Sequence, residues 1–417
     1  MEDRVIFHID VNNAFLSWTA VYLLKHGYHK DIREVPSVIG GDEKRRAGIV
    51  LAKSPVAKKL GVVSAETIYS ARKKCKDLEV YPPYYKYYSE KSKELMEYLS
   101  KYSPTIEQFS IDECFIDMSG TKYLYNDLIK LAYNIKDEIY EKFGYTVNIG
   151  IANNKLCAKM ASDFEKPNKV HTLFKDEIVS KLWPLDVADL FMCGKSTTKE
   201  LRAMNINTIG DLARTDKKKL VKHFKSMGEY LYNASRGIDN SKVEADRGER
   251  KSISTERTLP KDASTKEELK DILYKETLEV ARQLRNKKMY AKTITIIYKD
   301  ILFKKYSQQL TLNIPCNTDK ELYEKVMELF DASFKEEPIR LIGVRLSNLT
   351  ATKEAQLSIF DVEEDNKDDK FQETIDKINN KFGKSLIEPA ALKILDKEKY
   401  NRKEWLTKSH FLLINNI

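Results

Sequence analysis

The chain has 417 residues, of which 42% are hydrophobic and 32% charged, and its formal net charge is +9. This length suits two to four domains with real cores. No apolar run approaches a membrane span, no signal peptide is expected at the start, and five scattered cysteines without a CxxC pair argue against disulfides or a zinc site. We therefore expect a protein of a reducing, intracellular compartment.

The first 174 residues mix strands and helices. Strands are expected over 4–10, 35–41, 48–53, 78–82, 105–110, 114–118, 145–151 and 169–174. Helices are expected from about 13, and over 57–60, 68–75, 85–102, 123–142 and 154–163. This order predicts a mixed sheet with helices, interrupted by a small insertion over 13–80.

The rest of the chain divides into three parts. Residues 175–235 show short helical patches separated by glycines, and residues 236–250 are polar, as in a linker. Residues 251–349 then follow a βαββαβ order, with strands near 251–259, 291–298, 307–312 and 339–349 and helices near 265–287 and 318–334. We expect both helices on one face of a four-stranded sheet and polar side chains on the other.

Three carboxylates stand where strands are expected to end. Asp112 and Glu113 are adjacent between two apolar runs, and Asp10 ends the first strand. Side chains alternate along a strand, so both members of the pair cannot point into one core, whereas a turn would present both at a strand end. If the strands pair, the three repel each other and favour a hard divalent cation such as Mg²⁺. The sequence thus predicts two-metal phosphoryl or nucleotidyl transfer; the alternative is a solvated turn.

Charge is unevenly distributed. Residues 281–305 carry eight lysines and arginines against one Asp, whereas residues 361–369 form an acidic run. A basic body with an acidic segment suggests a polyanionic partner, although each cluster alone could be a solvated face.

Separated motifs along nearly the whole chain resemble those of Y-family (translesion) DNA polymerases. They are His8-Ile-Asp-Val-Asn-Asn-Ala-Phe15, Ser110-Ile-Asp-Glu113, Ala158-Lys-Met-Ala-Ser-Asp-Phe-Glu-Lys-Pro-Asn168, Lys251-Ser-Ile-Ser-Thr-Glu-Arg-Thr258 and Ile339-Arg-Leu-Ile-Gly-Val-Arg-Leu346. The resemblance implies an α+β multidomain, right-hand polymerase similar to bacterial DNA polymerase IV. Its palm would comprise 1–12 and 81–174, its fingers 13–80, its helix-hairpin-helix thumb 175–235, its linker 236–250, its little finger 251–349 and its tail 350–417.

The resemblance also implies site residues. Asp10, Asp112 and Glu113 match the catalytic, metal-binding carboxylates, with the Val11 carbonyl as a further ligand. They would hold two Mg²⁺ ions, with Mn²⁺ as a possible substitute. Phe15 matches the aromatic steric gate that excludes a 2′-OH; the alternative is an ordinary core residue at the start of its helix.

The nucleotide grip departs from the family pattern. Lys166 matches the lysine that reaches the triphosphate, but Pro55 and Lys58 stand where the family has Tyr and Arg. Lysine supplies charge without the bidentate fork of arginine, so we expect a weaker or differently arranged grip. In the helical module, Met192 replaces the first glycine of a helix-hairpin-helix loop.

The C-terminal half is expected to bind partners. Candidates for DNA contacts are Lys251, Arg257, Arg285, Lys287, Lys288 and Lys292, some of which could be ordinary solvated residues. The pentapeptide with Gln356, Leu357, Ile359 and Phe360 resembles the bacterial sliding-clamp-binding peptide. Residues 370–384 have helical spacing without an assigned role.

The resemblance as a whole implies an error-prone translesion DNA polymerase without proofreading. Its expected partners are primer-template DNA, dNTPs and the sliding clamp, with no membrane, and we expect a monomer in the bacterial cytoplasm, at the nucleoid when on DNA. The alternatives are a non-catalytic, clamp-bound scaffold and a cyclase on a similar palm.

Overall fold

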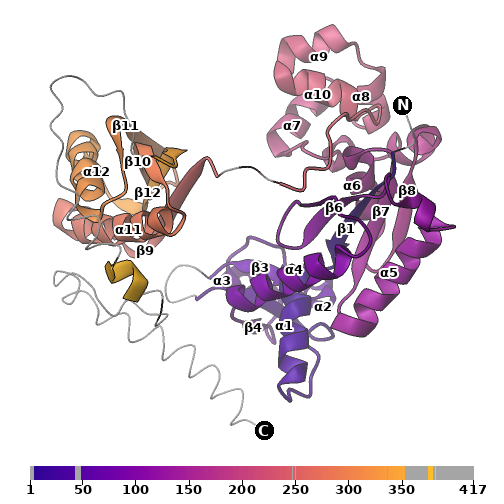
Figure 1. Cartoon of the computed structure of the whole chain (residues 1–417), viewed down its shortest axis with the longest axis horizontal. Coiled ribbons are helices and arrows are strands. Elements are labelled where there is room, and N and C mark those ends of the chain that lie inside the picture. The colour runs from indigo at the N-terminus through magenta and orange to yellow at the C-terminus, as the bar shows by residue number, and fades with distance from the viewer. Residues whose placement is uncertain are drawn as a thin grey trace. The chain divides into compact units, whose positions relative to one another are not determined.

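The computed structural model describes residues 4–42, 48–246, 248, 250–335, 337–352, 374–378 and 381. These residues form two compact units that divide between 248 and 250 (Figure 1). Both units combine sheets and helices, so the α+β multidomain prediction is confirmed.

The first unit is built on a five-stranded sheet in the order β5-β6-β1-β7-β8. The central strand β1 (Ile6–Val11) lies antiparallel between β6 (Glu113–Asp117) and β7 (Val147–Ala152). The edges are β5 (Ile106–Gln108), antiparallel to β6, and β8 (Val170–Leu173), parallel to β7. The sheet is therefore mixed, as predicted.

Alternation along these strands feeds two apolar cores. On one face the strands pack with α1 (Ala14–Lys25), α4 (Tyr85–Leu99) and α5 (Leu128–Phe143). On the other face they pack with α6 (Lys155–Asp163) and the helical module. The expected helix over 123–142 was wrong at its start, because the Asp127 side chain caps α5 by accepting from the amides of Ile129 and Lys130, and η2 (Lys122–Leu124) is a separate turn.

The expected insertion contains a small sheet with its own core. Its order is β3-β2-β4, with β2 (Ser37–Gly40) antiparallel to β3 (Val50–Lys53) and parallel to β4 (Glu79–Tyr81). The helices α2 (Pro55–Lys59) and α3 (Ile68–Lys74) add Ala57, Ile68 and Ala71 to this core.

A helical module completes the first unit. After the short turns η3 (Lys175–Glu177), η4 (Ile178–Leu182) and η5 (Val187–Asp189) come α7 (Lys195–Ala203), α8 (Ile209–Arg214), α9 (Lys217–Phe224) and α10 (Ser226–Ala234). The following segment stays fastened to the sheet. The Lys155 ammonium donates to the carbonyl of Lys242 and pairs with Glu107, whose carboxylate accepts from the Glu244 amide.

The second unit has the predicted βαββαβ order. Its sheet runs β11-β10-β12-β9 and is antiparallel throughout, from β9 (Ser252–Ala263), β10 (Tyr290–Asp300), β11 (Lys305–Cys316) and β12 (Ile339–Thr350). The helices α11 (Lys266–Asn286) and α12 (Asp319–Ser333) pack beside each other and share one apolar core with the strands (Figure 1). Within the tail, residues 374–378 are helical, in agreement with the helical spacing there.

All five cysteines are buried and free. Burial raises the pKa of Cys114, Cys157 and Cys193. In the part of the chain that the structure describes, no helix has the length and apolar character that crossing a bilayer requires.

Candidate active site

The pairing of β1 with β6 brings the carboxylates to one end of the sheet. Asp10 lies directly opposite Glu113 in register, and Asp112 occupies the turn that joins β5 to β6. The amide of Val11 donates to the carbonyl of Asp112 at 3.0 Å, which ties this turn to the central strand. The predicted pairing of the strands is therefore confirmed.

Two lysines from the α6 region reach into this cluster. The Lys159 ammonium lies 2.7 Å from a Glu113 carboxylate oxygen and 3.3 Å from Asp10. The Lys166 ammonium lies 3.0 Å from the same Asp10 oxygen. Asp163 pairs with both lysines, at 3.4 Å and 2.8 Å, so that acidic and basic groups alternate across the site.

The three carboxylates differ in electrostatic environment. Burial alone would raise the pKa of Glu113, but hydrogen bonds from His8 and Lys159 lower it to about 2. The pKa of Asp112 is raised, because burial and the charges of Asp10 and Glu113 outweigh a hydrogen bond from Ser110. Burial would lower the pKa of Lys159, yet the surrounding carboxylates raise it. The charged forms of Glu113 and Lys159 thus stabilise each other, whereas the charged form of Asp112 is destabilised by its surroundings.

The donor set suits a hard cation only in part. Among the described residues, no three His, Cys, Asp or Glu side chains stand close enough together to hold a metal ion. The predicted three-carboxylate cluster is thus not assembled, because the Lys159 ammonium lies between Asp10 and Glu113 while Asp112 accepts a hydrogen bond from Ser110. The chemistry nonetheless fits: all three are oxygen donors, and Asp112 is a partly buried carboxylate that makes no ion pair within the described residues.

Three further residues support Glu113 and were not predicted. The fully buried His8 ring contacts Glu113 through Nε2 at 3.1 Å and the Ser162 hydroxyl through Nδ1 at 2.8 Å. Ser162 in turn donates to the carbonyl of Lys159. His8, Lys159 and Ser162 all lie within the quoted motifs, but their convergence depends on how α6 packs against β1.

A buried amide network positions the loop that carries Lys166. Asn12 donates to the Asn148 side chain at 3.0 Å and accepts from the Asn168 amide at 2.9 Å. Asn148 also donates to the carbonyls of Ser162 and Glu165. The loop that carries Lys166 is therefore held in place by hydrogen bonds to Asn12, which follows β1, and to Asn148 of β7.

The Phe15 ring lies at the start of α1. It stacks on Tyr88 with ring centroids 4.8 Å apart and an interplanar angle of 11°, and it is partly buried against the first core. This position is compatible with both a steric gate and a core residue. The ring packs on the core, and it stays partly exposed at a position five residues after Asp10.

The two predicted fingers positions lie on α2. Pro55 is its first residue, with Ser54 capping the helix through the Ala57 amide, and Lys58 is exposed. Asn13, at the start of α1, donates to the carbonyl of Lys53 at 2.7 Å, which connects the small sheet to the end of β1.

The helical module carries the predicted loop between η5 and α7. Met192 has a φ of 66°, the left-handed conformation that glycine adopts most readily, and its side chain is exposed. Gly194 caps α7. The backbone thus takes a glycine-like path despite the substitution.

The predicted DNA-contact residues do not share one environment. Lys251, Lys287, Lys288 and Lys292 are exposed, and Arg257 pairs with the buried Glu276 at 2.6 Å. Arg285 does not face solvent as the prediction required: its side chain is 8% exposed and held by Asp319 and Asp376. The clamp-peptide residues Gln356, Leu357, Ile359 and Phe360 lie outside the described residues.

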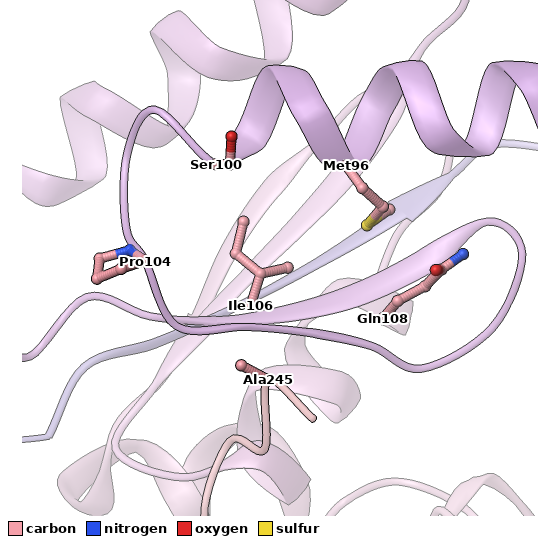
Figure 2. A pocket seen from close by; sticks show the side chains of 6 residues that line it. All are labelled: Met96, Ser100, Pro104, Ile106, Gln108 and Ala245. Atoms are coloured by element: carbon pink, nitrogen blue, oxygen red, sulfur yellow. The ribbon is translucent and has the colours of Figure 1, made fainter. Parts of the chain in front are cut away.

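A separate hollow of about 410 Å³ lies at the β5 edge of the sheet (Figure 2). Its lining combines the end of α4, β5 and the segment that follows the helical module, through Met96, Ser100, Pro104, Ile106, Gln108 and Ala245. None of the predicted site residues lines it.

Known protein families match three parts of this chain. The impB/mucB/samB family matches residues 9–163, and the C-terminal domain of the same family matches residues 250–359. The thumb domain of DNA polymerase iota matches residues 189–239.

Individual relatives match over most of their length. DNA polymerase IV of Clostridium acetobutylicum is 43% identical over 400 residues, covering 95% of this chain and 99% of the relative. DNA polymerase IV 1 of Bacillus subtilis is 32% identical over 393 residues, covering 94% and 93%. A solved Y-family DNA polymerase chimera superposes with a TM-score of 0.73 at 24% identity, covering 84% of this chain and all of the chimera, and thus shares its fold.

Proposed function

Because this chain belongs to the Y-family of DNA polymerases, we propose that it extends a primer 3′ end on a DNA template past damaged bases. It is a DNA-directed DNA polymerase of the DNA polymerase IV type. The finer proposal is error-prone synthesis without proofreading, supported by a sliding clamp. The observation that carries the polymerase proposal is the strand register that places Asp10 opposite Glu113, with Asp112 in the adjoining turn.

Asp10, Asp112 and Glu113, with the Val11 carbonyl, are the residues that would hold Mg²⁺. When bound, two such ions would activate the primer 3′ oxygen and neutralise the leaving pyrophosphate. The protein then contributes position and charge. His8 and Lys159 keep Glu113 ionised and oriented, which supports this role.

The nucleotide grip is proposed to rest on two lysines and one ring. Lys166, on its amide-fixed loop, would exchange Asp10 and Asp163 for the triphosphate. Lys58, exposed on α2, would supply a second positive charge. Phe15, held by the Tyr88 stack, would exclude a ribose 2′-OH.

Duplex DNA would be held by both units without sequence preference. The exposed lysines Lys251, Lys287, Lys288 and Lys292 support phosphate contacts in the second unit. Arg285 is not part of this proposal, because its guanidinium is buried and already donates to Asp319, Asp376 and the carbonyl of Asn317. Arg257 stays a weaker candidate, since it is half exposed but paired with Glu276.

Recruitment by the sliding clamp through Gln356–Phe360 remains a prediction from sequence. Deleting Leu357 and Phe360 should abolish clamp stimulation and leave basal extension intact. A cytoplasmic, monomeric protein in a bacterium is proposed with it, in line with the bacterial relatives.

The decisive experiment is primer extension on undamaged and abasic templates with Mg²⁺ and dNTPs. The matched control is Asp112→Ala/Glu113→Ala. Extension that disappears in the control supports the carboxylates as the catalytic centre, and extension past the abasic site supports the translesion role. An inactive natural chain, even with clamp added, would favour the non-catalytic scaffold.

A further inference from the structure

The second unit holds a side-chain cluster that the polymerase reaction does not use. Arg285, in the last turn of α11, donates from Nη1 to Asp319 at 2.7 Å and to the carbonyl of Asn317 at 2.8 Å. It donates from Nε and Nη2 to the two carboxylate oxygens of Asp376, at 2.5 Å and 3.3 Å. One guanidinium therefore joins α11, the start of α12 and the tail.

This cluster is buried. The side chains of Arg285, Asp319 and Asp376 are 8%, 18% and 10% exposed. A two-pronged contact between guanidinium and carboxylate is geometrically specific, and a buried charge left without its partner is costly. Arg285 and Asp319 also interact favourably with the helix dipoles, because the cation lies in the last turn of α11 and the anion in the first turn of α12.

The tail residues around Asp376 fit a docked helix. Residues 374–378 are helical, and Ile375 and Ile378 are partly buried while Thr374 and Lys377 are exposed. The short helix lies beside α11 in Figure 1, where the colour bar places residues 374–378. A helix with one buried and one exposed face is typical of a helix packed against a surface.

We propose that the adjoining ends of α11 and α12 form a docking site for the chain's own tail, with Asp376 as its anchor. The stretch between 352 and 374 is then tied to the second unit at both ends. That stretch contains Gln356–Phe360 and the acidic run 361–369. The docking stands apart from the polymerase assignment.

Amide hydrogen exchange on the full chain tests the docking. In Asp376→Asn, protection of residues 374–378 should fall about tenfold or more, because the buried charge pair is lost. Asp376→Glu should restore part of that protection, since it keeps the carboxylate. Arg282→Met is the matched control, as Arg282 lies one turn earlier on α11 and pairs only with Glu279 in the described contacts; it should leave residues 374–378 protected.

Equal exchange of residues 374–378 in the natural chain and in Asp376→Asn would overturn the proposal, as would an equal loss in Arg282→Met. The amides of β10 and β12 report whether the variant is folded, and if they lose protection the comparison passes to Asp376→Glu. Primer extension without clamp should be unchanged in Asp376→Asn. An inactive natural chain would refute the proposed function and leave the exchange result readable.

Discussion

At the scale of single residues, the charge of Glu113 is set by its neighbours. Its low pKa depends on two neighbours, His8 and Lys159, that come from different elements. A depressed carboxylate pKa stabilises the fold above its ordinary value of 4.5, and this contribution is lost as the pH falls toward 2. By linkage, a pKa shift from 4.5 to about 2 corresponds to roughly 3 kcal/mol of folding free energy.

Lys159→Met should remove much of this contribution. The free energy of unfolding of the first unit should be lower near pH 6 and should fall less between pH 4.5 and 2 than in the natural chain, because Glu113 then protonates at higher pH. Urea unfolding in EDTA across that range measures it. Lys169→Met is the control, since Lys169 and its partner Glu165 are both exposed; if the two variants behave alike, Lys159 does not hold Glu113.

Phe15 gives a second prediction at this scale. Phe15→Ala should raise ribonucleotide incorporation by on the order of tenfold or more, because the ring that would meet a 2′-OH is gone. It should also cost about 1–3 kcal/mol of stability through the lost Tyr88 stack. Phe15→Tyr keeps the ring and should keep the discrimination. Unchanged sugar selectivity in Phe15→Ala, measured with single nucleotides, would leave only the core role.

At the scale of elements, the contact of α6 with β7 places Lys159 and Ser162. A Cβ at Gly150 of β7 would lie 2.0 Å from the carbonyl oxygen of Ala158 and 2.5 Å from the amide of Ser162. Both are backbone atoms, which cannot rotate away. The helix can therefore approach the strand this closely only because position 150 has no side chain.

Gly150→Ala should push α6 outward. We expect a loss of about 2–4 kcal/mol in stability and a lower kcat, since Lys159 would withdraw from Glu113. Thermal unfolding and primer extension measure the two effects. Gly120→Ala, where a Cβ meets nothing within 4 Å, should change neither. Natural stability in Gly150→Ala would show that α6 adapts without cost.

What the sequence predicts at this scale follows from local signals. Alternation and turn residues place β1, β5 and β6, and hence Asp10, Asp112 and Glu113 at strand ends. The start of α5 is hidden because Tyr123 and Leu124 extend the apolar pattern ahead of the Asp127 cap. Lys159 and Arg285 are beyond local signals: one depends on α6 packing against β1, the other on a tail residue 91 positions away.

At the scale of the whole molecule, binding to DNA should be governed by charge. Lys287→Ala/Lys288→Ala/Lys292→Ala should weaken binding to all duplex sequences alike. Each lost phosphate contact should reduce the slope of log K against log salt by about 0.9, so by roughly 2–3 in total. Fluorescence anisotropy from 50 to 200 mM salt measures it. Lys266→Ala/Lys325→Ala is the control, because both lysines pair with acids on the helices; an equal change there would make the effect one of net charge.

The burial of every cysteine has a practical consequence for labelling chemistry. Thiols react with maleimides as exposed thiolates, and here all five are covered, with burial raising the pKa of Cys114, Cys157 and Cys193. A single cysteine introduced on each unit should therefore take up dye selectively, without first removing the native five. The natural sequence can therefore serve directly as the background for site-specific fluorescent labelling of each unit.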